Sequence, residues 1–255
     1  VSGAMATEDI FLIQGPPGTG KTTTIMEIIK QQLFLNKKSR ILLTSQSHIA
    51  IDNALEKVIN GQLIADDLIA RYGSKSVKEK ITPTVLKYFK ELNIVENAQI
   101  VGITTMGITG IGYEKLGEFD LVIVDEAARA TYPETIPAII FAKKCIIVGD
   151  HKQLPPVGFV EEEFYNGLDT SRMKESMFEK LFNTLPEDRK IMLDEQFRMA
   201  PKIGRLVSEL FYEEKLRNGE KNEEDRILDF QLGWISSEDF KSEKDLNQST
   251  SNYNE

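Results

Sequence analysis

One glycine-rich segment, residues 15–22, has the composition and spacing needed to bind phosphate: Gly-Pro-Pro-Gly-Thr-Gly-Lys-Thr. Its glycines let the chain wrap closely around phosphate oxygens, so that backbone N–H groups and a helix N-terminus face them. We expect Lys21 to contact the β- and γ-phosphates of a nucleotide and the Thr22 hydroxyl to ligate Mg²⁺. A simple Gly/Pro turn is disfavoured because the whole pattern and both flanking segments fit. The expected nucleotide-binding residues of this loop are Gly15, Pro16, Pro17, Gly18, Thr19, Gly20, Lys21, Thr22 and Thr23.

A pair of acidic residues supplies the second half of such a site. The apolar residues 121–124 are followed directly by Asp125 and Glu126. A buried strand would deliver both carboxylates to the carboxyl edge of a sheet, where α/β proteins bind ligands. We expect Asp125 to hold the magnesium ion and Glu126 to polarise the water that attacks a phosphoanhydride. The alternative is that both acids cap the N-terminus of the next helix.

The segments that position these residues alternate between strand and helix patterns. Nearly continuous Ile/Leu/Val runs indicate strands covered on both faces, and their alternation with helices predicts an α/β fold with a parallel sheet. Residues 60–96 break the pattern and are predicted to be a charged, helical insertion without a strand, while the polar residues 236–255 are predicted to be loop or disordered. Predicted strands are 10–14, 40–45, 99–104, 120–124, 144–149, 189–193 and 227–235; predicted helices are 22–35, 48–59, 133–141, 177–185 and 200–211.

Composition excludes several classes of protein. No apolar run approaches the ~20 residues of a membrane span, so we expect no membrane association. Cys145 is the only cysteine, which excludes an internal disulfide and fits the reducing cytoplasm, or the nucleus in a eukaryote. The net charge of −9 disfavours nucleic acid at first sight, yet much of the negative charge lies in residues 219–255. The rest of the chain can therefore still hold a local basic groove.

Five further segments follow one another in a distinctive order: residues 43–52, 102–105, 125–128, 148–157 and 195–199. Together with the phosphate loop they resemble motifs Ia, Ic, II, III and IV of the superfamily 1 helicases, in particular of the group that contains the nonsense-mediated-decay helicase and senataxin. The resemblance runs from about residue 10 to the end, with His48 where asparagine is usual and Phe197 where tyrosine is commoner.

The resemblance implies a RecA-like P-loop NTPase that uses ATP and Mg²⁺. It implies that Gln153 senses the γ-phosphate and that Arg198 reaches that phosphate from a second RecA-like lobe. It also implies that Phe197 stacks on the nucleobase. Alone, these residues also fit a capping amide, an interlobe salt bridge and a core aromatic, respectively.

Single-stranded RNA or DNA is the partner that the resemblance implies, and protein partners are possible too. The residues that would contact phosphate oxygens are small donors near the ends of predicted strands. The alternative is that these hydroxyls cap turns and helices, as Ser and Thr commonly do. The candidates are Ser45, Ser47, Thr104 and Thr105.

The expected organisation is a first RecA-like lobe at residues 1–185, with the insertion at 60–96. Residues 186–255 would begin an incomplete second lobe and end in the polar tail, because motifs V and VI do not follow. We therefore expect ATP binding and hydrolysis as the core of a helicase or translocase, in a fragment or truncated form. The main alternative is a nucleotide-dependent binding or regulatory module with little turnover, and a small-molecule P-loop kinase is a remote third.

Overall fold

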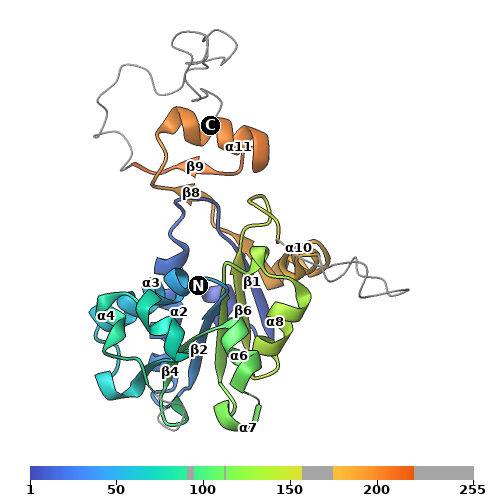
Figure 1. The fold of residues 1–255 in the computed structure, drawn as a ribbon. Helices are drawn as coiled ribbons and strands as arrows, with labels where there is room; N and C mark the ends of the chain where they lie inside the picture. Colours follow the sequence, from blue (N-terminus) through green and yellow to red (C-terminus); the bar gives the residue numbers. More distant parts are fainter. Residues whose placement is uncertain (91–94, 112, 157–174, 221–255) are drawn as a thin grey trace, which may run out of the picture.

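The computed structural model describes residues 1–90, 95–111, 113–156 and 175–220, and its centre is a seven-stranded sheet (Figure 1). The strand order is β3-β4-β2-β5-β6-β1-β7, and every pairing is parallel. The predicted α/β class with a parallel sheet is therefore confirmed. Six strands lie where the sequence predicted them: β1 (Ile10–Gln14), β2 (Ile41–Ser45), β4 (Ile100–Thr104), β5 (Leu121–Asp125), β6 (Cys145–Gly149) and β7 (Lys190–Met192).

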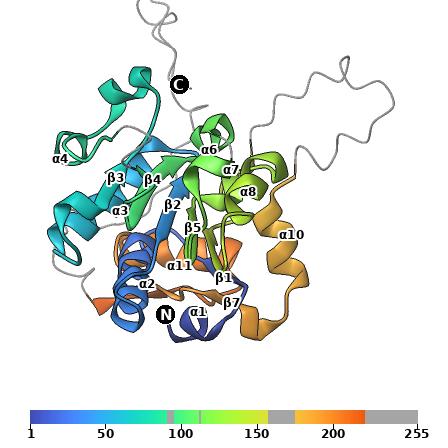
Figure 2. The same ribbon diagram turned by 90° about the horizontal axis from the view of Figure 1, so that it is seen from below.

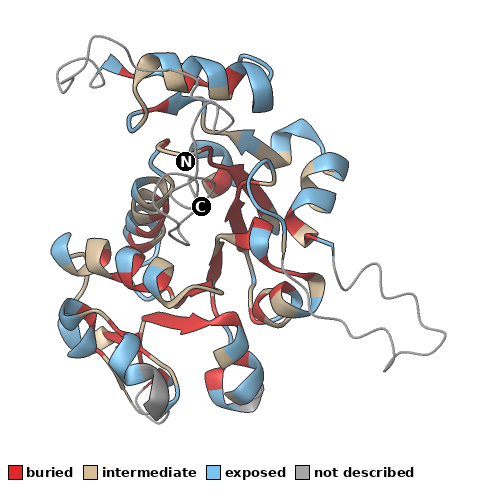
Figure 3. Cartoon of the chain, turned by 45° about the horizontal axis from the view of Figure 1, so that its top comes forward, coloured by how far each residue is buried: buried red, intermediate tan, exposed pale blue. Residues whose placement is uncertain are grey.

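Both faces of the sheet are covered by helices, as the apolar strands require. In β5, Leu121 and Ile123 belong to one buried cluster while Val122 and Val124 belong to another, so alternate side chains serve opposite faces. Figure 2 shows the helices around the sheet, and Figure 3 shows the buried strands with exposed surfaces on the helices outside them. These helices include α1 (Ser2–Ala6), α2 (Lys21–Leu35), α3 (His48–Asn60), α6 (Thr105–Ile111), α7 (Tyr113–Leu116), α8 (Tyr132–Ile139) and α10 (Met177–Thr184).

The predicted insertion at residues 60–96 contains a strand, so that part of the prediction is wrong. β3 (Ile69–Arg71) pairs in parallel with β4 and forms one edge of the sheet. Its three residues include Arg71, a charged residue that interrupts any apolar pattern. The guanidinium is nevertheless buried, because it forms an ion pair with Asp52 of α3. The other elements are short: the 3₁₀ helices Asp66–Leu68 and Lys75–Lys80, and α4 (Pro83–Leu86).

The end of the described chain forms a small second unit. β7 (Lys190–Met192) falls in the range expected for the second lobe, yet it pairs with β1 at the other edge of the sheet. Figure 1 shows the remaining elements together above the sheet. They are β8 (Glu195–Gln196), which pairs with β9 (Arg217–Asn218), and α11 (Pro201–Phe211). The predicted strand 227–235 and tail 236–255 lie outside the described residues.

Candidate functional site

The predicted phosphate loop connects β1 to α2 and has the backbone that its glycines permit. β1 ends at Gln14 and α2 begins at Lys21. Gly18 and Gly20 have φ of 78° and 80°, a left-handed conformation that costs glycine little. The loop is held at its start by a hydrogen bond from the Gly15 N–H to the Gly149 carbonyl (2.9 Å). The N-terminus of α2 therefore opens directly onto the space that the loop encloses.

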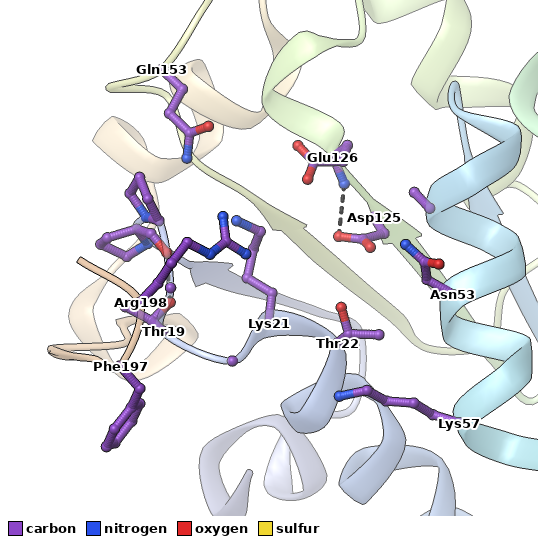
Figure 4. Close-up of a pocket in the computed structure, with 15 residues that line it drawn as sticks. Thr19, Lys21, Thr22, Asn53, Lys57, Asp125, Glu126, Gln153, Phe197 and Arg198 are labelled. Carbon is purple, nitrogen blue, oxygen red and sulfur yellow. Dashed lines mark hydrogen bonds between the residues drawn. The ribbon is translucent and has the colours of Figure 1, made fainter. Parts of the chain in front are cut away.

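A cavity of about 620 Å³ lies over this loop and gathers most of the predicted nucleotide-site residues (Figure 4). Of the predicted loop, Gly15 and Thr23 do not line it; Gly15 instead accepts a hydrogen bond from Lys21 Nζ through its carbonyl (2.8 Å). The residues that line it from the loop are Pro16, Pro17, Gly18, Thr19, Gly20, Lys21 and Thr22, and from other elements Asp125, Glu126, Gln153, Phe197 and Arg198. These residues, from four separate stretches of the chain, therefore meet in one space.

The acidic pair lies at the carboxyl edge of the sheet, beside the loop. Asp125 is the last residue of β5, and burial together with the nearby Glu126 carboxylate raises the pKa of Asp125 to about 6. Glu126 has φ of 54° and its backbone N–H donates to Asp125 Oδ1 (2.9 Å). Although Glu126 precedes the 3₁₀ helix Ala127–Arg129, its side chain makes no capping hydrogen bond among the described residues. Its carboxylate therefore remains available to the cavity.

The same corner of the cavity has the donors that a magnesium ion prefers. The Thr22 hydroxyl and the Asp125 carboxylate lie on the same side of the cavity in Figure 4, and both offer oxygen. A divalent cation there would also offset the repulsion between Asp125 and Glu126 that contributes to the raised pKa of Asp125. No group of three or more His, Cys, Asp or Glu side chains able to hold a metal occurs in the described ranges. Such a sparse protein ligand set fits Mg²⁺, which usually keeps waters and substrate phosphates as its other ligands.

Gln153 approaches the cavity from the loop after β6. Its side chain points toward Lys21 and Arg198 in Figure 4. Gln153 Nε2 donates to Asp150 Oδ2 (2.7 Å), and the Gln153 backbone N–H donates to the Asp150 carbonyl (3.1 Å). A capping-type contact and a place in the nucleotide cavity are therefore combined in one residue.

The backbone at Arg198 and Met199 is held by the buried side chain of Gln196. Gln196 Oε1 accepts hydrogen bonds from the backbone N–H groups of Arg198 (2.9 Å) and Met199 (2.7 Å). Its Nε2 donates to Asn218 Oδ1 (2.6 Å), which ties the segment to β9. Arg198 extends toward Lys21, whereas the Phe197 ring is 48% exposed, so it is not a core residue.

Three residues of α3 also line the cavity, and the sequence did not predict them. Ala50, Asn53 and Lys57 recur at helical spacing on one face of α3. Lys57 Nζ donates to the hydroxyl of Thr23 in the first turn of α2 (2.7 Å). The i, i+3, i+7 spacing could have placed these residues on the face of the helix that carries the helicase-like motif. That motif ends at residue 52, however, before Asn53 and Lys57.

The candidate nucleic-acid residues lie at the same edge of the sheet, on β2 and β4. Ser45 is opposite Thr104 in the β2–β4 register. The Ser47 hydroxyl accepts from Ala50 N–H (3.4 Å) and the Thr104 hydroxyl accepts from Gly107 N–H (3.1 Å), so both cap the following helices. The buried hydroxyl of Thr105 has no hydrogen-bond partner among the described residues. A separate cavity of about 360 Å³, which Thr104 helps to line, opens beside them.

The fold and this cavity define a RecA-like P-loop NTPase of the helicase type. Residues 1–92 and 75–161 match a family model described as an AAA domain, and residues 173–255 match a second model with that description. The chain belongs to the superfamily 1 helicases, in the group that contains the nonsense-mediated-decay helicase, senataxin and DNA2.

Known relatives are similar over most of this chain. It is 35% identical over 221 residues to the DNA replication ATP-dependent helicase/nuclease DNA2 of Saccharomyces cerevisiae, covering 84% of the chain and 14% of the relative. It is 30% identical over 278 residues to the DNA polymerase alpha-associated DNA helicase A of Schizosaccharomyces pombe, and this match covers 89% of the chain and 40% of the relative. The chain thus spans less than half the length of either protein.

Among solved structures, the complex of arterivirus nonstructural protein 10 (helicase) with DNA has a similar fold. Its TM-score is 0.53 at 16% identity, and the match covers 85% of this chain and 43% of that one. At this level of identity the likeness concerns the fold alone. Separately, none of the helices in the described ranges is long and apolar enough to cross a membrane.

Proposed function

We propose that this chain binds and hydrolyses ATP as part of a helicase or translocase core that acts on single-stranded nucleic acid. The observation that carries the proposal is the single cavity in which the phosphate loop, the acidic pair, Gln153 and Arg198 meet. Each group has the chemistry that phosphoryl transfer to water needs: cations, a base and a nucleotide cradle.

The loop binds the triphosphate. Backbone N–H groups of the loop and of the N-terminus of α2 donate hydrogen bonds to the phosphate oxygens, and Lys21 exchanges its bond to the Gly15 carbonyl for the β- and γ-phosphates. Thr22 and Asp125 would hold Mg²⁺, which supplies positive charge to the phosphate oxygens when it is bound.

Hydrolysis then depends on groups from three elements. The Glu126 carboxylate accepts a proton from the attacking water, since it faces the cavity and makes no capping bond among the described residues. Arg198 brings a planar guanidinium to the charge that spreads over the equatorial oxygens in the transition state. Gln153 contacts the γ-phosphate, and the half-exposed ring of Phe197 stacks on the adenine.

Single-stranded nucleic acid would lie along the carboxyl edge of β2 and β4. Of the four candidates, Ser47 is partly exposed, whereas Ser45, Thr104 and Thr105 are buried, so a phosphate contact by these three would require this edge to open. The names of the two relatives, both of them DNA helicases, support this class of partner. We also propose two lobes with a boundary after Met192, because β7 is hydrogen-bonded to the first sheet. The free, buried thiol of Cys145 suits a reducing compartment such as cytoplasm or nucleus.

The test is the ATPase rate of the chain with Mg²⁺, measured alone and with single-stranded oligo(dT) or oligo(U). Hydrolysis stimulated by either polymer and lost in Lys21→Ala supports the proposal. ATP binding without turnover in both conditions would instead establish a nucleotide-dependent binding module. Transfer of phosphate to a small acceptor rather than to water would establish a kinase.

A further inference from the structure

Asp150, directly after β6, is a buried carboxylate that gathers side chains from three parts of the chain. It is only 3% exposed. Asp150 Oδ1 accepts from Gln14 Nε2 (3.1 Å), and Asp150 Oδ2 accepts from Gln153 Nε2 (2.7 Å) and from the Tyr212 hydroxyl (2.6 Å). A carboxylate removed from water needs such donors, and here two of the three, Gln14 and Tyr212, are distant in sequence.

Each donor is connected to a different part of the nucleotide site. Gln14 is the last residue of β1 and directly precedes the phosphate loop. Gln153 lines the nucleotide cavity itself. Tyr212 follows α11, in the second unit that also carries Arg198. Asp150 therefore links, by hydrogen bonds, the strand that leads into the loop, the amide over the cavity and the unit that supplies the arginine.

The Tyr212 hydroxyl remains a hydrogen-bond donor in this cluster because it stays protonated. The residue is 4% exposed. Burial and the hydrogen bond to Asp150 raise the pKa of the Tyr212 hydroxyl above its ordinary value, so it remains protonated and donates. Hydrogen bonds to a charged acceptor are shorter and stronger than those between neutral groups, as the 2.6 Å separation of Tyr212 and Asp150 illustrates.

We propose that Tyr212 is a positioning residue for ATP hydrolysis, which acts through Asp150 on Gln153. The hydroxyl fixes the second unit against Asp150 and, through the shared Oδ2 atom, ties the position of that unit to the orientation of the Gln153 amide. Gln153 and Arg198 then reach the γ-phosphate together. This inference rests on the proposed ATPase function and extends it to a residue outside the nucleotide cavity.

The experiment is single-turnover hydrolysis of ATP, with protein in excess, by the wild-type chain and by Tyr212→Phe. Because phenylalanine keeps the ring and removes only the hydroxyl, we expect a rate about 10-fold to 100-fold lower at an unchanged half-saturating protein concentration. In the Gln153→Ala background the same change should cost much less, since the part of its effect that runs through Gln153 is already lost. Tyr88→Phe is the matched control, because Tyr88 is also buried but lies beside the edge strand β3, where its carbonyl accepts from the Arg71 N–H (2.8 Å).

The outcomes separate the inference from the proposed function. Wild-type rates in Tyr212→Phe, or an equal loss in the Gln153→Ala background, would overturn the positioning role while leaving the ATPase intact. If the wild-type chain hydrolyses no ATP, the proposed function is wrong. Hydrogen exchange then tests separately whether Tyr212 holds Gln153 in place through Asp150. Faster exchange of the Gln153 backbone N–H in Tyr212→Phe supports that link; unchanged exchange overturns it.

Discussion

Gly18 of the phosphate loop lies in direct contact with Arg198. A methyl group at Gly18 would stand 2.6 Å from Cβ of Arg198, and the Gly18 carbonyl accepts a hydrogen bond from the Phe197 N–H (3.0 Å). The segment that carries Phe197 and Arg198 therefore packs directly against the phosphate loop. A change in either one is expected to displace the other.

Gly18→Ala should lower ATP hydrolysis strongly, for two reasons. Its φ of 78° is strained for alanine, and the new methyl group would push Arg198 away from the loop. The steady-state ATPase rate without nucleic acid measures the effect. Gly110→Ala is the control, because a methyl group there meets no atom within 4 Å. Equal losses in the two variants would contradict the contact as the cause.

Glu126→Gln should retain ATP binding while slowing hydrolysis by about 100-fold or more, the usual contribution of a general base. Fluorescent-nucleotide titration measures the binding, and single-turnover hydrolysis measures the rate. The matched control is Glu118→Gln, which removes the same charge from an exposed position. Unchanged hydrolysis in Glu126→Gln would remove Glu126 from its role as the base.

Lys57→Met should weaken ATP binding several-fold, because it removes a cation from the wall of the cavity and keeps most of the side-chain volume. The loss should shrink as salt is added, since screening already weakens the wild-type attraction. Titration of ATP at low and high ionic strength measures both effects. Lys30→Met on the exposed face of α2 is the control, and equal affinities in the two variants would count against a nucleotide contact.

Asp52→Ala should destabilise the fold by about 3–5 kcal/mol, because it leaves the Arg71 guanidinium buried without its partner. Arg71 Nε donates to Asp52 Oδ1 (2.8 Å), and both side chains are fully buried. Denaturant unfolding measures the change. Asp66→Ala breaks the exposed pair with Lys87 and should leave stability nearly unchanged. A small effect of Asp52→Ala would show that the pair is not required.

His48 should make stability fall as the pH falls. Burial and the charge of Arg71 lower the pKa of His48 below 6.5, and Arg71 Nη2 lies 2.9 Å from His48 Nδ1, which must then accept. The unfolded chain therefore binds a proton more readily than the folded one, so stability is lost as pH drops below about 6.5. Denaturant midpoints between about pH 8 and about pH 5 measure this slope, and His48→Asn should reduce it.

The sequence predicted the parts of the fold whose signals are local. The first four residues of β5 and of β6 are apolar, and the phosphate loop is a contiguous pattern. β3 escaped prediction because its Arg71 is buried only by virtue of an ion pair with Asp52 on α3. A short stretch of sequence around Arg71 does not contain that partner. The Asp150 cluster escaped for the same reason, since its partners Gln14 and Tyr212 are 136 and 62 residues away.

The direct passage from β7 into β8 has a mechanical consequence. Only Leu193 and Asp194 separate the two strands, and each is held by a backbone hydrogen bond: Leu193 N–H to the Gln14 carbonyl, and Asp194 carbonyl to Arg217 N–H. Any rotation of the second unit about this covalent connection depends on the backbone torsion angles of these two residues. Both lie beside β1, the strand that leads into the phosphate loop. The connection thus serves as a hinge. Because Leu193 is hydrogen-bonded to Gln14, directly before the phosphate loop, any rotation at this hinge is coupled to the nucleotide site.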